Sequence, residues 1–204
     1  MRTRARRVAI IIFDEVELLD LAAPLEVLSV AGRRWNFRPY KLELLSRGGG
    51  LVTTRNQARI EANELCGAAP ADIVLVPGGY GARRFAASPE DVAELRRIAE
   101  GAELVAAIGN GVLALARAGF CDVDQVAAAP DVLDELRTLL PAERCDESAR
   151  VVEGQRVLSA ASSGSALALG LAIVRRSMGP KLVSMIAAEL GLDIDERQIL
   201  EIRY

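Results

Sequence analysis

Residues 103–111, Glu-Leu-Val-Ala-Ala-Ile-Gly-Asn-Gly, are the stretch of sequence that decides the fold. The apolar run Leu104 to Ile108 predicts a strand that is buried on both faces. Gly109 then turns the chain, almost without a loop, into an apolar helix that ends near Gly119. A buried strand that leads directly into a helix is typical of a parallel sheet covered by helices.

The same alternation of strands and helices extends along the rest of the chain. The pattern predicts strands at 8–13, 40–46, 71–76, 125–129 and 156–160, and helices at 18–31, 89–100, 131–140, 164–176 and about 180–190. Short segments at 51–54 and 58–62 predict an antiparallel pair near a sheet edge, and 150–153 forms a hairpin with 156–160. The sequence therefore predicts one α/β domain over residues 1–204, with a mostly parallel sheet between two layers of helices and a basic tail at 1–7.

Composition sets limits on the function. Of 204 residues 51% are hydrophobic and 26% are charged, which suits one globular domain. The net charge of −3 does not point to nucleic acid or to an anionic membrane. No apolar stretch is long enough to span a bilayer, and the run after the basic start is too short for a signal peptide. We therefore expect a cytoplasmic protein.

Histidine is absent, so the chain cannot use histidine in catalysis with its own residues. The three cysteines, Cys66, Cys121 and Cys145, are widely spaced and lack a CxxC pattern, which argues against a disulfide framework and against a zinc site. We expect neither a metal nor a cofactor.

Three turns follow predicted strands and should meet at the carboxyl ends of the sheet, where ligands bind in such folds. They are residues 13–20 with Asp20, residues 77–81 with Gly78, Gly79 and Tyr80, and residues 109–111 with Gly109 and Asn110. Glycines in a strand-to-helix turn allow backbone N–H groups to approach a ligand, although such a turn also occurs without one. Asp20 taken alone fits a helix N-cap as well as a binding residue.

The turn at 109–111 has the sequence layout of a nucleophile elbow, in which a strained central residue carries the reactive side chain. Glycine tolerates the unfavourable dihedral angles, so the bend can persist with Gly109 at its centre. Glycine has no side chain, so the elbow carries no nucleophile.

Taken together, these segments resemble the ThiJ/PfpI superfamily of class I glutamine amidotransferase-like domains, nearest to the isocyanide hydratases and the sensor domains of AraC-type regulators. The resemblance rests on the segment 13–27, FDEVELLDLAAPLEV, on DIVLVPGG at 72–79, on the strand and helix at 104–120, and on Ser159-Ala160 with the following helix. It covers about 8–190 and implies a flavodoxin-like three-layer sandwich.

The departures from that family concern its catalytic groups. Family enzymes carry cysteine at the elbow, where this chain has Gly109, and many carry a histidine at the position that matches Ala129. An acidic residue of the penultimate helix is matched by Leu167. Asp20, which partners the cysteine in the hydratase branch, remains. Cys121 lies about 15 Å along the helix from the elbow, so it does not replace the lost thiol.

Three functions are consistent with these features. The first is a non-catalytic domain that binds a small polar or carbonyl-containing ligand, with Asp20 as acceptor and backbone donors from Gly79 or Tyr80 and from Asn110. Gly78 and Gly109 are also expected among the ligand-binding residues. The second is an isocyanide hydratase-like or glyoxalase-like lyase in which Asp20 is the general base. The third, expected from the resemblance, is a homodimeric regulatory module, which would act through a partner because no DNA-binding helices follow the domain. The side chains of Tyr80, Arg83 or Arg84 could also plug the pocket.

Overall fold

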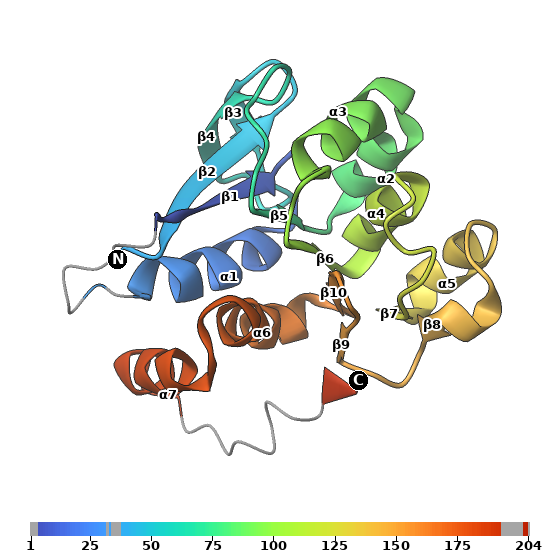
Figure 1. The fold of residues 1–204 in the computed structure, drawn as a ribbon. Coiled ribbons are helices and arrows are strands. Elements are labelled where there is room, and N and C mark those ends of the chain that lie inside the picture. Colours follow the sequence, from blue (N-terminus) through green and yellow to red (C-terminus); the bar gives the residue numbers. More distant parts are fainter. Residues whose placement is uncertain (1–3, 32, 34–37, 193–201, 204) are drawn as a thin grey trace.

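The computed structural model describes residues 4–31, 33, 38–192 and 202–203, and it shows a nine-stranded sheet between two layers of helices (Figure 1). The strand order is β11-β9-β10-β6-β5-β1-β2-β4-β3. The strands are β1 (Arg6–Ile11), β2 (Tyr40–Ser46), β3 (Gly50–Thr53), β4 (Arg59–Glu64), β5 (Ile73–Val76), β6 (Leu104–Ile108), β9 (Val151–Glu153), β10 (Val157–Ala160) and β11 (Ile202–Arg203). The helices are α1 (Leu18–Val30), α2 (Tyr80–Ala87), α3 (Pro89–Ala99), α4 (Val112–Arg117), α5 (Pro130–Arg137), α6 (Ala166–Met178) and α7 (Pro180–Glu189).

The centre of the sheet is parallel, as the sequence predicts. β1 pairs in parallel with β2 and β5, and β6 pairs in parallel with β5 and β10. The hairpins β3–β4 and β9–β10 are antiparallel, and β3 forms one edge of the sheet. The predicted three-layer α/β class is therefore confirmed.

Alternate residues of β1 show how the two layers share the sheet. Val8 and Ile10 are buried in a core with α1, α6 and α7, whereas Ala9 and Ile11 are buried in a second core with α2, α3 and α4. Side chains alternate between the faces of a strand, so a continuous apolar run can fill both cores. This explains why the central strands are recognisable from hydrophobicity alone.

Helix α2 was missed by the sequence analysis, which expected a turn at 77–81 and no helix before Pro89. The structure shows two successive helices that meet at Ser88, whose side chain accepts a hydrogen bond from the N–H of Asp91 at 3.2 Å and so caps α3. The eight residues of α2 include Gly81, which weakens the helical signal, and tertiary packing of Phe85 stabilises the helix instead.

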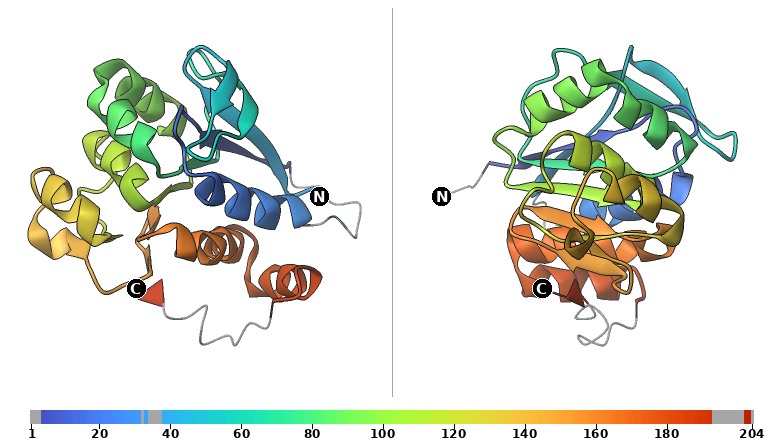
Figure 2. Two further views of the ribbon diagram at one scale, coloured as in Figure 1. Left: turned by 180° about the vertical axis from the view of Figure 1, so that it is seen from behind. Right: turned by 90° about the vertical axis from the view of Figure 1, so that its right-hand side faces the viewer.

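The predicted strand at 125–129 is shorter and lies elsewhere than expected. Only Val126–Ala127 (β7) is a strand, and it pairs with β8 (Cys145–Asp146) in a separate two-stranded sheet. Figures 1 and 2 show this segment, with α5, at the side of the molecule next to α4. Two residues are too few for periodicity to show which sheet a strand joins.

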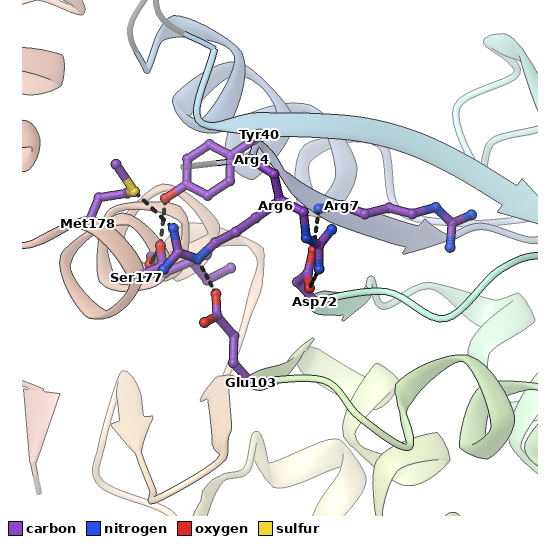
Figure 3. Close-up of polar contacts among 9 residues, drawn as sticks. Arg4, Arg6, Arg7, Tyr40, Asp72, Glu103, Ser177 and Met178 are labelled. Carbon is purple, nitrogen blue, oxygen red and sulfur yellow. Dashed lines mark hydrogen bonds and ion pairs between the residues drawn. The ribbon is translucent and has the colours of Figure 1, made fainter. Parts of the chain in front are cut away.

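The basic start of the chain is part of the fold from Arg6 onward, within the stretch 1–7 that was expected to be a tail. β1 begins at Arg6, at the amino ends of the parallel strands (Figure 3). The contacts there are an ion pair of Arg6 with Glu103, a hydrogen bond from Arg7 N–H to Asp72 at 2.7 Å, and one between Tyr40 and Ser177 at 2.6 Å. Burial raises the pKa of Tyr40 to about 12, so its hydroxyl stays protonated in this network.

Candidate functional site

The three predicted turns do meet at the carboxyl ends of β1, β5 and β6. The N–H of Gly78 donates to Asp20 Oδ2 at 3.0 Å, which joins the second turn to the first. The N–H of Gly79 donates to Asn110 Oδ1 at 2.9 Å, which joins the second turn to the third. The predicted convergence of these turns is therefore confirmed.

Gly79 is held on both sides by its neighbours. The Asn110 amide accepts from the Gly79 N–H and also donates to the Gly79 carbonyl oxygen at 2.9 Å, while Val16 forms a β-bridge to Gly79. Gly79 has φ +119°, and a Cβ there would collide with backbone atoms of Glu15 and Glu17. Because the N–H of Gly79 is already donating to Asn110, and that of Gly78 to Asp20, their expected role as ligand donors needs correction. Both instead hold the turn in shape.

Gly109 forms the elbow that the sequence indicates. Ile108 ends β6 in an extended conformation, Gly109 has φ +53°, and residues 109–111 then form a 3-10 turn that continues into α4. An ideal Cβ placed on Gly109 would have Asp20 Oδ2 as its nearest atom, at 4.0 Å. A side chain at the elbow would therefore point towards Asp20, with its Cβ in van der Waals contact with the carboxylate.

Asp20 is a buried carboxyl group and not an N-cap. It lies within the first turn of α1, whose N-cap residue is Glu17, and it is 2% exposed. Among the described residues, none donates a hydrogen bond of ordinary geometry to Asp20 Oδ1. Burial raises the pKa of Asp20, while the Ser163 side chain and the Gly78 N–H lower it and the Glu17 carboxylate raises it slightly further.

A pocket of about 170 Å³ opens above Asp20 and Gly109. Its wall contains Tyr80, which is 53% exposed, and Arg55, whose guanidinium stacks 4.1 Å from the centre of the Tyr80 ring and donates to its hydroxyl at 2.9 Å. Arg83 crosses to α5, where it pairs with Glu135 at 2.6 Å. Tyr80 and Arg83 thus form part of the wall and leave the pocket open. Arg84 does not line it.

Several pocket residues were not found by sequence reasoning. They are Glu17, Arg55, Asp131, Ala161, Ser162 and Ser163. The serines follow β10, so the rule that ligands gather at the carboxyl ends of parallel strands could have identified them. Arg55 lies in the turn of the β3–β4 edge hairpin and reaches the site only through tertiary structure. Ala129, the position that matches the family histidine, does line the pocket.

The cysteines do not contribute to this site. Burial raises the pKa of Cys121 to about 12 and also raises the pKa of Cys145, whereas Cys66 is exposed on the surface.

Across the residues that the structure describes, no three histidine, cysteine or acidic side chains gather in a way that could hold a metal ion. In the same part of the chain, no helix is long and apolar enough to cross a membrane.

Comparison with known proteins agrees with this geometry. The model of the DJ-1/PfpI family matches residues 6–176, which include all three turns of the site. The chain belongs to the DJ-1/PfpI family. A protein of Streptomyces lividans, described as an uncharacterized protein in the cpoL 5′ region, is 32% identical to it over 123 residues, which are 60% of this chain and 86% of that protein.

Solved structures of DJ-1/PfpI proteins share the fold. Drosophila melanogaster DJ-1beta superposes with a TM-score of 0.81 at 21% identity, over 94% of this chain and all of that chain. An AraC family transcriptional regulator from Pseudomonas putida superposes with a TM-score of 0.76 at 22% identity, over 91% of this chain and 99% of that one. The flavodoxin-like three-layer architecture is therefore shown by both the sequence family and the structures.

Replacing Asp20 by asparagine is expected to make this DJ-1/PfpI domain more stable near neutral pH. Burial raises the folded pKa of Asp20 above its ordinary value of 3.8, so between these two values the native protein holds a proton that the unfolded chain has lost. The free energy of unfolding therefore falls as pH rises through this interval, by about 1.4 kcal/mol for each unit of difference in pKa. Asparagine retains an acceptor for the Gly78 N–H and has no such titration.

Urea denaturation of the wild type and of Asp20→Asn from pH 4 to pH 8 measures this effect. The two stability curves should separate as pH rises, with the variant above the wild type. Curves that run parallel over the whole range would show that the pKa of Asp20 is the same in the folded and unfolded chains.

Proposed function

We propose that this protein is a DJ-1/PfpI domain that binds a small polar or carbonyl-containing molecule without forming a covalent bond to it. The observation that carries the proposal is the elbow at Gly109, which retains φ +53° and is oriented so that a Cβ on it would lie 4.0 Å from Asp20 Oδ2. The enzymes of the family that this sequence resembles have a cysteine at this position. The site keeps the shape of a reaction centre while the reactive atom is missing. This supports ligand binding without catalysis.

The remaining groups can recognise a polar ligand. Asp20 Oδ1 receives no hydrogen bond of ordinary geometry from the described residues, and the Ser163 side chain is the neighbouring polar group at this carboxylate, so both can interact with a ligand in the pocket. Tyr80 begins α2, and the N–H groups of a first helical turn lack intrahelical acceptors, so its N–H can donate to a carbonyl oxygen. The Arg55 guanidinium adds a positive charge at the rim. No metal or cofactor is needed for this recognition.

Calorimetric titration with a panel of small amides and hydroxyaldehydes, whose N–H or O–H groups can donate to the Asp20 carboxylate while their carbonyl oxygen accepts from the Tyr80 N–H, tests the proposal. We expect saturable binding by the wild type and roughly tenfold weaker binding by Asp20→Asn, because hydrogen bonds to charged groups contribute about 1.5–3 kcal/mol. Asp122→Asn, a change at an exposed aspartate outside the pocket, is the matched control and should bind as the wild type does. Equal affinity of all three proteins, or no binding by any, would contradict the proposal.

A second candidate is a hydratase or lyase that uses Asp20 as a general base towards a bound water molecule. The raised pKa of Asp20 favours this candidate, because a base with a pKa nearer to neutrality transfers protons more effectively. Turnover of an isocyanide and of glyoxal, measured with the wild type and with Asp20→Asn, distinguishes it from binding alone. Catalysis requires the wild type to exceed the variant, with a rate that rises with pH through the pKa of Asp20; equal background rates remove this candidate.

We also propose that the domain forms a homodimer and acts as a regulatory module through a partner protein. The AraC family regulator among the structural relatives supports a regulatory use of this fold. The three cysteines are free thiols, which supports the expected cytoplasmic location. The net charge of −3 gives no support to direct binding of nucleic acid. Sedimentation velocity should give twice the chain mass of 21.8 kDa; a monomer at micromolar concentration would refute the dimer.

A further inference from the structure

A second pocket, of about 400 Å³, lies on the other side of α2 from the candidate site. Tyr80 and Arg83 of α2 line the first pocket, whereas Gly81, Arg84 and Phe85 of the same helix line the second. Its volume falls within the range of pockets that hold small molecules. This second pocket takes no part in the candidate site or in the functions proposed for it.

The floor of this second pocket contains a buried hydroxyl group without a partner. Ser46 ends β2, is 3% exposed and lines the pocket, and its Oγ has no hydrogen bond among the described residues. Its carbonyl oxygen accepts from the N–H groups of Gly49 at 3.1 Å and Leu65 at 2.9 Å, which fixes the backbone that carries the hydroxyl. An unpaired buried polar group costs stability, so the hydroxyl is a ready contact for a ligand.

Apolar rings form another part of the lining. Phe13 and Phe85 pack with their ring centres 5.6 Å apart, and Leu51, which is 57% exposed, lies in the same wall. A hydrophobic group placed against them would remove apolar surface from water. Phe85 is only 5% exposed, so Phe13 and Leu51 supply the apolar surface that a ligand side chain can cover.

Charges of both signs surround that apolar surface. Arg47 and Arg84 are each more than half exposed and come from different elements, the end of β2 and helix α2. Asp14 and Asp91 line the same pocket. The Arg47–Asp91 pair is long, at 3.3 Å, so a ligand with its own two charges can insert between these two groups without leaving either one unpaired. Arg84 already pairs with Glu15 at 2.6 Å, so it would share its guanidinium between Glu15 and the ligand.

We propose that this pocket binds a free amino acid with a large apolar side chain. Its carboxylate would pair with the guanidinium groups of Arg47 and Arg84, and its ammonium group with the carboxylates of Asp14 and Asp91. Its side chain would pack on Phe13 and Leu51, and the Ser46 hydroxyl would complete the polar contacts. A zwitterion matches the mixed charges, whereas a simple anion or cation satisfies only one sign.

The test is an NMR titration of the full chain with L-phenylalanine, with two analogues that each lack one charge, hydrocinnamate and phenethylamine, and with glycine. We expect saturable shifts of backbone amides at Leu51, Gly81 and Phe85 and not at Gly109, with the analogues and glycine at least about tenfold weaker. Arg84→Gln should weaken L-phenylalanine binding about tenfold, and Asp20→Asn should leave it unchanged.

Ser46→Ala provides a readout that a purely structural serine would not give. It should weaken L-phenylalanine binding while leaving the midpoint of thermal unfolding unchanged or higher, because it removes an unpaired buried hydroxyl. Absence of saturable shifts up to about 10 mM overturns the proposal, as do shifts confined to Gly109 and Asn110, or equal affinity for hydrocinnamate. If none of the carbonyl compounds binds at the first pocket, the outcomes expected at the second pocket are unchanged. The two proposals are therefore tested separately.

Discussion

Replacing Gly109 by cysteine is expected to create a reactive thiol with a pKa clearly below the usual value of about 8.5. The new Cβ would point towards Asp20, with its Oδ2 at 4.0 Å, at the start of the turn that leads into α4. Backbone N–H groups at the start of the α4 turn stabilise a thiolate, and Asp20, whose pKa is raised by burial, can share its proton with that thiolate. The thiol and the carboxyl group would then titrate as one pair.

The rate of reaction with a disulfide reagent, followed from pH 5 to pH 10, measures this pKa. Cys66 and Cys145 are replaced by serine in all samples, because Cys66 is exposed and Cys145 is partly so, while Cys121 is buried with a pKa of about 12. Gly101→Cys in the same background is the control, since a Cβ there meets nothing within 4 Å and an ordinary pKa is expected. A Gly109→Cys thiol that reacts no faster than the control at pH 7 would show that the elbow no longer supports a nucleophile.

The same substitution is expected to cost stability. A non-glycine residue at φ +53° adopts a sparsely populated backbone region, which costs about 1–3 kcal/mol, whereas Gly101→Cys should change the free energy of unfolding much less. Both values come from urea denaturation. The cost gives a physical reason for glycine at a site that no longer needs a side chain, because glycine adopts the elbow conformation with little strain.

Much of the central fold could be predicted from the sequence, because its signals are local. Runs such as Leu104 to Ile108 are apolar at every position, and this continuity alone indicates a strand covered on both faces. The turns after such strands also carry local marks, since Gly79 and Gly109 have backbone angles that favour glycine. The meeting of these turns then follows from the rule that parallel strands end at one edge of the sheet.

The parts that were missed depend on contacts between distant residues. Asn110 was expected to offer its backbone N–H to a ligand, yet its side chain holds Gly79, 31 positions earlier. Arg55 reaches the pocket by stacking on Tyr80, and its position in the turn of an edge hairpin gave no sign of this. The second pocket had no motif at all, because Ser46 at the end of β2 and Arg84 of α2 line one pocket only in the folded chain. Such groupings depend on tertiary structure, which hydrophobic periodicity does not encode.

Replacing Asp124 by alanine is expected to lower the free energy of unfolding by about 3–5 kcal/mol. The side chain is 4% exposed and accepts three backbone hydrogen bonds from the β9–β10 turn, from the N–H groups of Gln155 at 2.7 Å, Arg156 at 3.0 Å and Val157 at 3.0 Å. Each bond to a charged acceptor contributes about 1.5–3 kcal/mol, and alanine leaves the Val157 N–H buried without an acceptor.

The effect should reach the pocket, because the segment that Asp124 secures leads to the pocket wall. Ser159 of the adjoining β10 accepts the N–H of Ala127 at 2.8 Å, and the chain continues from β10 to Ser163 beside Asp20. The midpoint of thermal unfolding should fall by roughly 6–20 °C in Asp124→Ala. In Asp122→Ala, at an exposed position of the same loop, stability should change by no more than about 0.5 kcal/mol. Equal stability of the two variants would mean that water replaces the carboxylate at the turn, and that the wall carrying Ser163 is held by the strand pairing of β10 alone.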